Sequence, residues 1–264
     1  MQDIKKVKID AIVLAGGKTE ESLRGHSDCK SKGFIKINNR PMVEYVLEAI
    51  RETGRFGKIV LAADLSMIPE HTAAMADMLA SSGASIVESL KNGISALKPL
   101  PDFVLVLPCD MPLVTPEAIT NFIDQSLELP ADMTYAYLSK ENSEASYPDV
   151  KHTYVRILEG TFCGTGFFLM KPEIAGNLES LFSRFINNRK SPIGLAGILG
   201  FNVIIKFLLG FLSVEDVEKR VTKLMGGKVR VKGVRTRYAE AGFNVDAPNE
   251  LKIARQIMEN RKNE

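Results

Sequence analysis

Residues 102–120 read DFVLVLPCDMPLVTPEAIT, and this stretch contains the strongest strand signal in the chain. Residues 102–107 are apolar on both faces of a strand, which is typical of the centre of a parallel sheet. Thr115 is a favourable N-cap for a helix that runs to about residue 127. Between strand and helix, two prolines hold a short loop that carries Asp110. The order of strand, loop and helix indicates one unit of an α/β fold.

The same alternation extends through the first half of the chain. Residues 9–14 form a continuous apolar run that ends at a Gly-Gly pair, as a buried parallel strand does. The pattern also predicts strands at 58–63 and 84–88 and helices at 41–53, 69–80 and 90–97, with Asn38 and Asn39 as cap candidates for the first helix. Strands separated by helices imply right-handed crossovers, so we expect a three-layer, doubly wound, mostly parallel sheet.

The second half of the chain is less regular. Strand-like patterns occur at 133–138, 152–158 and 162–170, with a polar loop joining the first two. Helical patterns dominate residues 172–225, and a short strand at 228–234 and a helix at 248–260 follow them. No repeat or low-complexity linker divides the sequence. We therefore expect one domain over residues 1–264, with a helical insertion at about 172–225.

Composition and charge narrow the class of partner. The chain has 34 basic and 32 acidic residues and a net charge of +2, which argues against a general polyanion binder, so no nucleic-acid partner is expected. Cys29, Cys109 and Cys163 are odd in number and lack zinc-ligand spacing, which favours reduced thiols in the cytoplasm. The N-terminal residues lack the apolar core of a signal peptide, in line with a cytoplasmic location.

One segment complicates the reading of a soluble protein. Residues 193–212, IGLAGILGFNVIIKFLLGFL, contain a single charge, at Lys206. The length would suffice to span a bilayer, but a lysine deep in a membrane costs about 2.5–3.5 kcal/mol on insertion scales, and several glycines interrupt the run. We expect a buried or groove-lining helical segment, with contact to a membrane surface or a partner as the weaker alternative.

Two loops follow strands at the edge of the sheet where ligands bind in open α/β folds. The first contains GGKT, residues 16–19, which is not a Walker loop because the position that needs its first glycine is Ile12. The second contains Asp110. A carboxylate there fits a hard-cation ligand, although capping of the following helix or bonds from backbone N–H groups would also explain it.

Four motifs in chain order resemble the MobA-like nucleotidyltransferase family. They are LAGG at 14–17, a lysine before the PMVEYVLEAI helix, VLPCDMPLVTPEAI at 106–119 and GFNVDAPNEL at 242–251. The resemblance implies that Leu14, Ala15, Gly16 and Gly17 wrap a nucleotide. It further implies that Lys32 is the catalytic lysine, and that Asp110 and Asp246 hold a magnesium ion, with Asp110 also catalytic. By the same resemblance, residues 1–130 bind the nucleotide and residues 131–264 bind the acceptor.

Several further assignments stay open. Arg24 is either a triphosphate contact or a solvated charge, because its loop is longer than in the family, and Lys30 competes with Lys32 for the lysine role. Ser89 and Asn92 fall where relatives read the nucleotide, although helix capping would also explain them. In the family, the corresponding region faces the second substrate. The resemblance therefore implies that the acceptor is bound by Tyr147, Arg156, Gly164 and Thr165.

These observations favour one reaction class over two others. We expect a Mg²⁺-dependent transferase that moves a nucleoside monophosphate from an NTP to a phosphorylated small molecule and releases pyrophosphate. A nucleotide-sugar-dependent glycosyltransferase is the second option, but such enzymes often carry Asp-x-Asp, and the residue two after Asp110 is Pro112. A non-catalytic nucleotide-binding regulatory module is the third. The sequence leaves a homodimer open.

Overall fold

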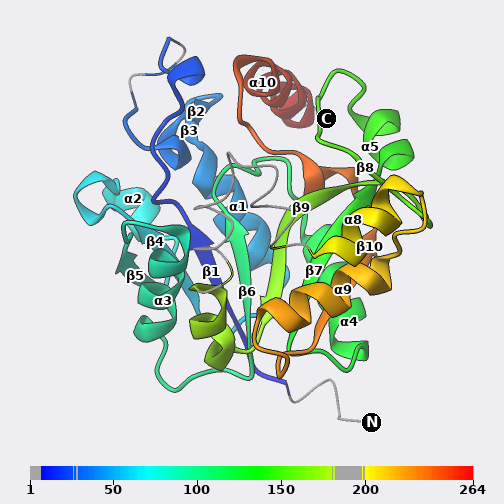
Figure 1. Ribbon diagram of the computed structural model, residues 1–264. Coiled ribbons are helices and arrows are strands. Elements are labelled where there is room, and N and C mark those ends of the chain that lie inside the picture. Colours follow the sequence, from blue (N-terminus) through cyan, green and yellow to red (C-terminus); the bar gives the residue numbers. More distant parts are fainter. Residues whose placement is uncertain are drawn as a thin grey trace.

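The computed structural model describes residues 7–25, 27, 29–179, 181, 198 and 200–263. The described residues form an eight-stranded sheet with helices on both faces (Figure 1). The strand order is β10-β7-β9-β6-β1-β4-β5, and β8 pairs with β9. Neighbours are parallel except at β9, which runs antiparallel to β6, β7 and β8. The predicted three-layer, mostly parallel α/β fold is therefore confirmed.

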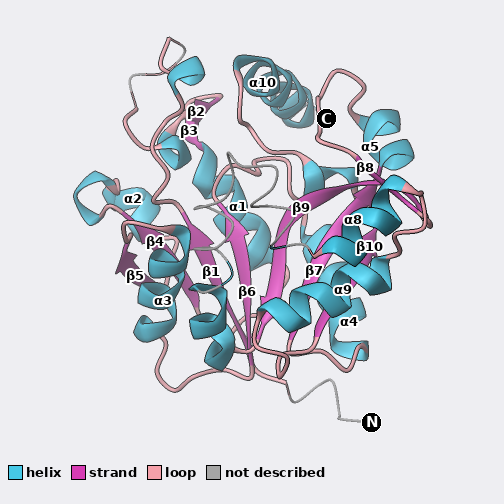
Figure 2. Cartoon of the chain, in the orientation of Figure 1, coloured by secondary structure: helices cyan, strands magenta, loops and turns pink. Residues whose placement is uncertain are grey.

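Figure 2 separates strands from helices along the chain. The strands of the large sheet are β1 Ile9–Leu14, β4 Ile59–Ala63, β5 Met78–Ser81, β6 Phe103–Pro108, β7 Met133–Ser139, β8 Val155–Ile157, β9 Gly160–Met170 and β10 Val231–Thr236. The α-helices are α1 Met42–Glu52, α2 Glu70–Ala73, α3 Ile86–Ala96, α4 Pro116–Glu128, α5 Lys140–Ser146, α8 Phe201–Leu208, α9 Val214–Leu224 and α10 Pro248–Asn263.

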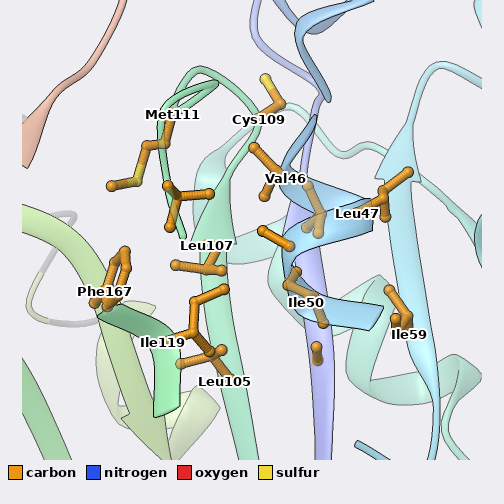
Figure 3. Packing of buried hydrophobic residues seen from close by; sticks show 14 of the residues in the cluster. Val46, Leu47, Ile50, Ile59, Leu105, Leu107, Cys109, Met111, Ile119 and Phe167 are labelled. Atoms are coloured by element: carbon orange, nitrogen blue, oxygen red, sulfur yellow. The ribbon is translucent and has the colours of Figure 1, made fainter. Parts of the chain in front are cut away.

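The central strands are apolar throughout because helices cover both of their faces. In β1, Ala11 and Val13 belong to the core under α1 and α4, whereas Ile12 points into the core under α3. The same alternation holds in β6, where Leu105 and Leu107 face α1 and α4. Figure 3 shows this packing, with side chains of α1 against those of β6. Each large apolar side chain buried here contributes about 1.5–3 kcal/mol, so the sheet centre is a rigid support for the loops at its ends.

The edge of the sheet beyond β4 differs from the prediction. The helix expected at 69–80 ends at Ala73, because β5 occupies Met78–Ser81. The strand expected at 84–88 is wrong: Ser85 caps α3 by accepting a hydrogen bond from the backbone N–H of Glu88. Ser85 and Glu88 have the spacing of a helix-start motif, and this local signal outweighs the short alternating pattern.

Two more local predictions are wrong for reasons of turn and cap chemistry. Asn38 and Asn39 do not cap α1 but have φ values of 49° and 68°, which form the tight turn of a small hairpin, β2 Lys36–Ile37 and β3 Arg40–Pro41. The polar loop expected after β7 contains α5, whose N-cap Ser139 accepts a bond from the backbone N–H of Asn142. The last strand, expected at 228–234, is β10 at Val231–Thr236.

The apolar segment 193–212 lies only partly within the described residues. Its described part contains α8. The expected burial holds for Ile198 and Leu212 but is wrong for α8, because Phe201 and Leu208 are 76% and 74% exposed. α9 follows, starting at the cap Ser213; α9 packs on β10, and α8 packs on α9 (Figure 1). Throughout the described part of the chain, no helix combines the length and hydropathy that crossing a bilayer requires.

Candidate functional site

Three charged side chains from distant parts of the sequence meet beyond the carboxyl end of β6. The Lys32 ammonium lies 2.5 Å from Asp110 Oδ2 and 2.5 Å from Asp246 Oδ1. It also lies 3.2 Å from Glu20 Oε1. Lys32 and Asp110 are buried, whereas the side chain of Asp246 is 68% exposed. One nitrogen thus links two carboxylates that are 136 positions apart in the sequence, and one of them opens to solvent.

Backbone contacts hold these residues in place. Asp110 is the second residue after β6, and its carbonyl oxygen accepts a hydrogen bond from the Val245 backbone N–H at 2.9 Å. Asn244 Nδ2 donates to Asp110 Oδ1 at 2.9 Å. The C-terminal NVD segment is therefore fastened to the Asp110 loop by two bonds, and this fastening brings Asp246 to the site.

Close packing positions the lysine. Lys32 begins a short 3₁₀ helix, η3 Lys32–Phe34, and its backbone N–H donates to the Gly17 carbonyl. A Cβ added at Gly33 would lie 3.0 Å from Cys109 Sγ and 3.3 Å from Ala15 Cβ. Glycine at position 33 therefore lets the lysine loop lie directly against the ends of β1 and β6.

Burial and charge act in opposite directions on the groups of this cluster. Burial alone lowers the pKa of Lys32, but the charge and hydrogen bond of Asp110, followed by those of Asp246, raise that pKa above its usual value. Lys32 is therefore cationic throughout the neutral range. Burial raises the pKa of Cys109 far above the usual thiol value, so Cys109 is a neutral thiol and an inert packing group.

A pocket of about 570 Å³ lies beside this cluster, on the side of β1, β4 and β5. Its lining combines three basic side chains with one carboxylate and several small residues. The lining residues are Gly16, Gly17, Lys18, Thr19, Arg24, Ser27, Cys29, Lys30, Ser31, Asp64, Met67, Ser82 and Gly83. The excess of cationic groups fits an anionic ligand, and the glycines give the ligand access to backbone groups.

The two glycines of the first motif have different roles. A Cβ at Gly16 would overlap Ser82 Cβ, so Gly16 allows the loop after β5 to close one wall of the pocket. Gly17 has open space around it and offers its carbonyl to Lys32. As the spacing indicates, this is not a Walker loop. Lys18 pairs with Ser31 in an antiparallel bridge, and Thr19 donates its backbone N–H to the Lys30 carbonyl and its hydroxyl to the Cys29 carbonyl.

Ser89 and Asn92 lie behind the pocket wall. Ser89 Oγ accepts from the Gly83 backbone N–H at 2.9 Å and donates to the Ser85 carbonyl. Asn92 Nδ2 donates to the Ser81 carbonyl at 2.9 Å. Both side chains hold the loop of residues 81–83 and do not cap a helix. Leu14 and Ala15, in turn, end β1 beneath the glycines, and Arg24 and Lys30 both line the pocket.

The residues predicted to face an acceptor do not converge on one point. Tyr147 packs on Phe243 with ring centroids 5.0 Å apart, and burial raises the pKa of Tyr147 to about 12. Arg156 is exposed on β8. Gly164 leaves room for the Tyr135 hydroxyl, and Thr165 Oγ1 donates to the Ala136 carbonyl within the sheet. In this arrangement the glycine and threonine of β9 stabilise strand packing.

Sequence reasoning missed several groups that contact the site. Glu20 pairs with Lys32, Asn244 orients Asp110, and Ser82 forms part of the pocket wall. The asparagine could have been found, because it lies two residues before Asp246 in the quoted NVD motif. The contacts of Glu20 and Ser82 depend on how loops fold over one another, for which the sequence offers no local signal.

The two aspartates are suitable ligands for a hard divalent cation. Asp110 and Asp246 offer carboxylate oxygens, and Lys32 shows that one small cationic group reaches both. Among the described residues, no group of three or more His, Cys, Asp or Glu side chains is arranged to hold a metal ion. Mg²⁺ needs only one or two carboxylates when substrate phosphates and water complete its coordination, so the donor set fits this ion.

Comparison with known proteins gives a family match and a common fold. The family model of the MobA-like NTP transferase domain matches residues 11–159. The chain is 24% identical over 130 residues to a molybdenum cofactor guanylyltransferase of Shewanella halifaxensis. This match covers 49% of the chain, and the chain spans only 61% of the length of that relative.

Solved structures extend the similarity to nearly the whole chain. A hypothetical transferase from Thermus thermophilus has 32% identity and a TM-score of 0.77, with 92% of this chain and 99% of that chain covered. The 4-diphosphocytidyl-2C-methyl-D-erythritol synthase of Anaerococcus prevotii has 14% identity and a TM-score of 0.60, with 96% and 99% covered. The second likeness shows the fold alone.

Proposed function

The chain belongs to the MobA-like NTP transferase family and is a nucleotidyltransferase, and we propose that it needs Mg²⁺ and that its acceptor is a phosphorylated small molecule. In this reaction an acceptor phosphate oxygen attacks the α-phosphorus of an NTP. A new oxygen–phosphorus bond forms, the bond to the β-phosphate oxygen breaks, and pyrophosphate leaves. The meeting of Lys32, Asp110 and Asp246 carries the proposal.

The proposed roles follow from charge and position. The pocket with Lys18, Arg24 and Lys30 binds the triphosphate, and the Gly16-Gly17 turn faces the nucleoside. Lys32 stays cationic and donates hydrogen bonds to phosphate oxygens as negative charge moves toward pyrophosphate. Residues 1–130 thus form the nucleotide half and residues 131–264 the acceptor half of one domain.

Asp110 and Asp246 are the proposed holders of the cation. Bound there, Mg²⁺ would neutralise phosphate charge and orient the leaving group. The protein needs no covalent intermediate, because holding two reactants in line can lower the barrier by up to about 7–11 kcal/mol. The neutral, buried Cys109 supports this direct transfer.

Pyrophosphate release tests the proposal. Each of the four NTPs is incubated with Mg²⁺ and pools of sugar phosphates and polyol phosphates, and pyrophosphate is measured. We expect release with at least one pairing, loss of release with EDTA, and loss in the Asp110→Asn variant. Asp124→Asn is a matched control, because Asp124 pairs with Arg55 on the outer side of α4. Full activity in Asp110→Asn would remove the metal assignment.

Two alternatives give different results in the same assay. A glycosyltransferase would release a nucleoside diphosphate from a nucleotide sugar, and Pro112 in place of a second aspartate disfavours that reaction. A regulatory module would bind NTP without releasing pyrophosphate. NTP binding without pyrophosphate release, for every combination of NTP and acceptor, would favour the regulatory module.

The exposed face of α8 is proposed to be a contact surface with a second copy of the chain. Five apolar side chains of α8 and of the turn that follows it are 46–76% exposed, namely Phe201, Phe207, Leu208, Leu209 and Phe211. One fully exposed phenylalanine offers about 150–250 Å², so these partly exposed side chains supply a substantial part of the ~800 Å² that each partner contributes to a standard interface. Among the described residues, Lys206 of α8 is paired with Asp216 and Lys219 of α9 with Glu215, so these two lysines are not free charges that would attract an anionic membrane.

Light scattering after size exclusion tests the dimer. We expect a dimer for the natural chain and a monomer for a Phe211→Ser, Leu208→Ser double variant with unchanged pyrophosphate release. A monomeric natural chain, or its flotation with phosphatidylserine vesicles, would overturn the proposal in favour of a monomer or a membrane contact. We further propose a cytoplasmic location, in line with the free thiols of Cys29, Cys109 and Cys163.

A further inference from the structure

The Lys32 ammonium lies between the two carboxylates that are proposed to bind a divalent cation. It is 2.5 Å from Asp110 Oδ2 and 2.5 Å from Asp246 Oδ1, and we call the place between these two oxygens the cation position. The other oxygen of Asp110, Oδ1, accepts a hydrogen bond from Asn244 Nδ2 at 2.9 Å. Two cations at such short range repel each other strongly. Lys32 and a divalent cation therefore compete for the cation position.

Glu20 is a third carboxylate in contact with Lys32, and the proposed cation site does not use it. Its Oε1 lies 3.2 Å from the Lys32 nitrogen, and its side chain is 42% exposed. This contact is longer than the contacts of Lys32 with Asp110 and Asp246, so the two aspartates hold the ammonium more closely. Among the ion pairs of the described residues, Glu20 is the partner that remains to Lys32 when the aspartates bind a cation.

The loop holds Glu20 in place independently of Lys32. Thr19, which precedes it, is buried and hydrogen-bonded across the base of the loop. The Glu20 carbonyl accepts a bond from the backbone N–H of Leu23 at 3.0 Å, and Leu23 is fully buried. Because Thr19 also lines the 570 Å³ pocket, an ammonium held by Glu20 stays next to the pocket proposed for the triphosphate.

Lys32 can change partners without moving its backbone. Its backbone N–H donates to the Gly17 carbonyl at 3.0 Å, and Gly33 packs against Cys109. The charge, by contrast, is carried at the end of a flexible four-carbon stem. An ammonium has three donors, so Lys32 can bond Glu20 and still offer hydrogen to a phosphate oxygen.

We propose that Glu20 is a positioning residue for Lys32. Before substrate binds, Lys32 occupies the cation position by bridging Asp110 and Asp246. When an NTP binds together with its divalent cation, Lys32 releases the two aspartates, keeps its contact with Glu20 and donates its other N–H bonds to the phosphates. The inference rests on the proposed function, because it requires that Asp110 and Asp246 bind a cation.

Binding of Mn²⁺, a paramagnetic substitute for Mg²⁺, tests whether Lys32 occupies the cation position. Free Mn²⁺ is measured by electron paramagnetic resonance in the absence of nucleotide. We expect Lys32→Met to bind Mn²⁺ about tenfold or more tightly than the natural chain, because a competing positive charge is removed. Adding Asp110→Asn to Lys32→Met should abolish this gain. Lys32→Gln, also neutral, replaces Lys32→Met if that variant does not fold.

The Mn²⁺ measurements separate failure of the inference from failure of the proposed function. Equal Mn²⁺ affinity of the natural chain and the neutral Lys32 variant would overturn the inference, and so would a gain that Asp110→Asn leaves intact. If the natural chain binds no Mn²⁺ even with a non-hydrolysable NTP, the proposed cation site itself is contradicted.

A double-mutant cycle tests whether Glu20 acts through Lys32. Glu20→Gln should lower kcat for pyrophosphate release about tenfold in the natural chain and less than about twofold in the neutral Lys32 variant, because contacting residues are not additive. Glu21→Gln removes an exposed carboxylate at the next position and is the matched control, with kcat expected to be unchanged. Equal losses in both backgrounds, an unchanged kcat in Glu20→Gln, or the same loss in Glu21→Gln would each refute the positioning role.

Discussion

Replacing Lys32 with alanine tests the centre of the proposed mechanism. In the natural chain the Lys32 ammonium lies 2.5 Å from both Asp110 and Asp246, and in the reaction it is expected to face the phosphates. Removing one preorganised donor to developing charge typically lowers kcat about 10²–10³-fold, or about 2.7–4 kcal/mol. We expect a loss of this size in pyrophosphate release at saturating NTP.

The same substitution has a calculable effect on stability. Removing one partner of a buried ion pair costs about 3–5 kcal/mol, and the low end applies here because the Asp246 side chain is exposed. At about 2–4 °C of Tm per kcal/mol for a chain of this size, Tm should fall by roughly 6–12 °C. Millimolar Mg²⁺ should restore part of that Tm, because a divalent cation can pair the two carboxylates that Lys32→Ala leaves free.

The control is Lys18→Ala, because Lys18 is exposed at the pocket rim and, within the described part of the chain, is paired through its backbone with Ser31. It should raise KM for NTP and leave kcat within about tenfold, since an exposed phosphate contact contributes mainly to binding. The reasoning is refuted if Lys18→Ala loses more kcat than Lys32→Ala, or if Lys32→Ala keeps more than a tenth of the natural kcat.

Three further predictions concern the metal, the pocket wall and acid stability. In Asp110→Asn, calorimetry should detect Mg²⁺ binding weakened about tenfold or more, because one of two carboxylate ligands is lost; unchanged affinity would contradict the assignment. In Gly16→Val the new side chain collides with Ser82, so KM for NTP should rise about tenfold or more while Tm changes little; an unchanged KM would show that the wall can move aside. Hydrogen bonds from Arg230 hold the pKa of Asp132 well below its usual 3.8. The ionised carboxylate therefore stabilises the fold at pH values above 3.8, and this stabilisation is lost as the pH falls from 3.8 toward the lowered pKa. Asp132→Asn should therefore lower the free energy of unfolding at pH 7 by about 1–2 kcal/mol given the exposed partners, and the difference in Tm from the natural chain should shrink below pH 3.8; a difference independent of pH would be inconsistent with this pairing.

The parts of the fold that could be predicted are those whose signal is local and repeated. β1 and β6 are apolar at every position because helices cover both faces, and that pattern is visible without any tertiary information. β5 and α3 were misplaced because β5 is only four residues long and lies at the sheet edge, where half-exposed residues such as Met78 carry little pattern. The start of α3 was nevertheless marked by Ser85 and Glu88.

The residues of the candidate site also differ in whether a local sequence signal could predict them. Asp110 stood out because it leaves a buried strand, and its meeting with Asp246 followed from matching motifs rather than from any local rule. Two partners that complete the site could not be predicted in this way: Glu20 and Ser82 reach it through contacts that depend on how the loops fold over one another. Such contacts arise from packing, which propensity and periodicity do not encode.

The paired base of the loop between the glycine turn and Lys32 has a consequence for protein engineering. The bridge between Lys18 and Ser31, together with the bonds of Thr19, closes the loop before it reaches the lysine. Doubling the length of a flexible loop beyond such a closure costs only about 0.6 kcal/mol. Changes in loop length between Thr19 and Lys30 should therefore leave the lysine in register as long as the buried Leu23 and the site contacts of Glu20 and Arg24 are kept.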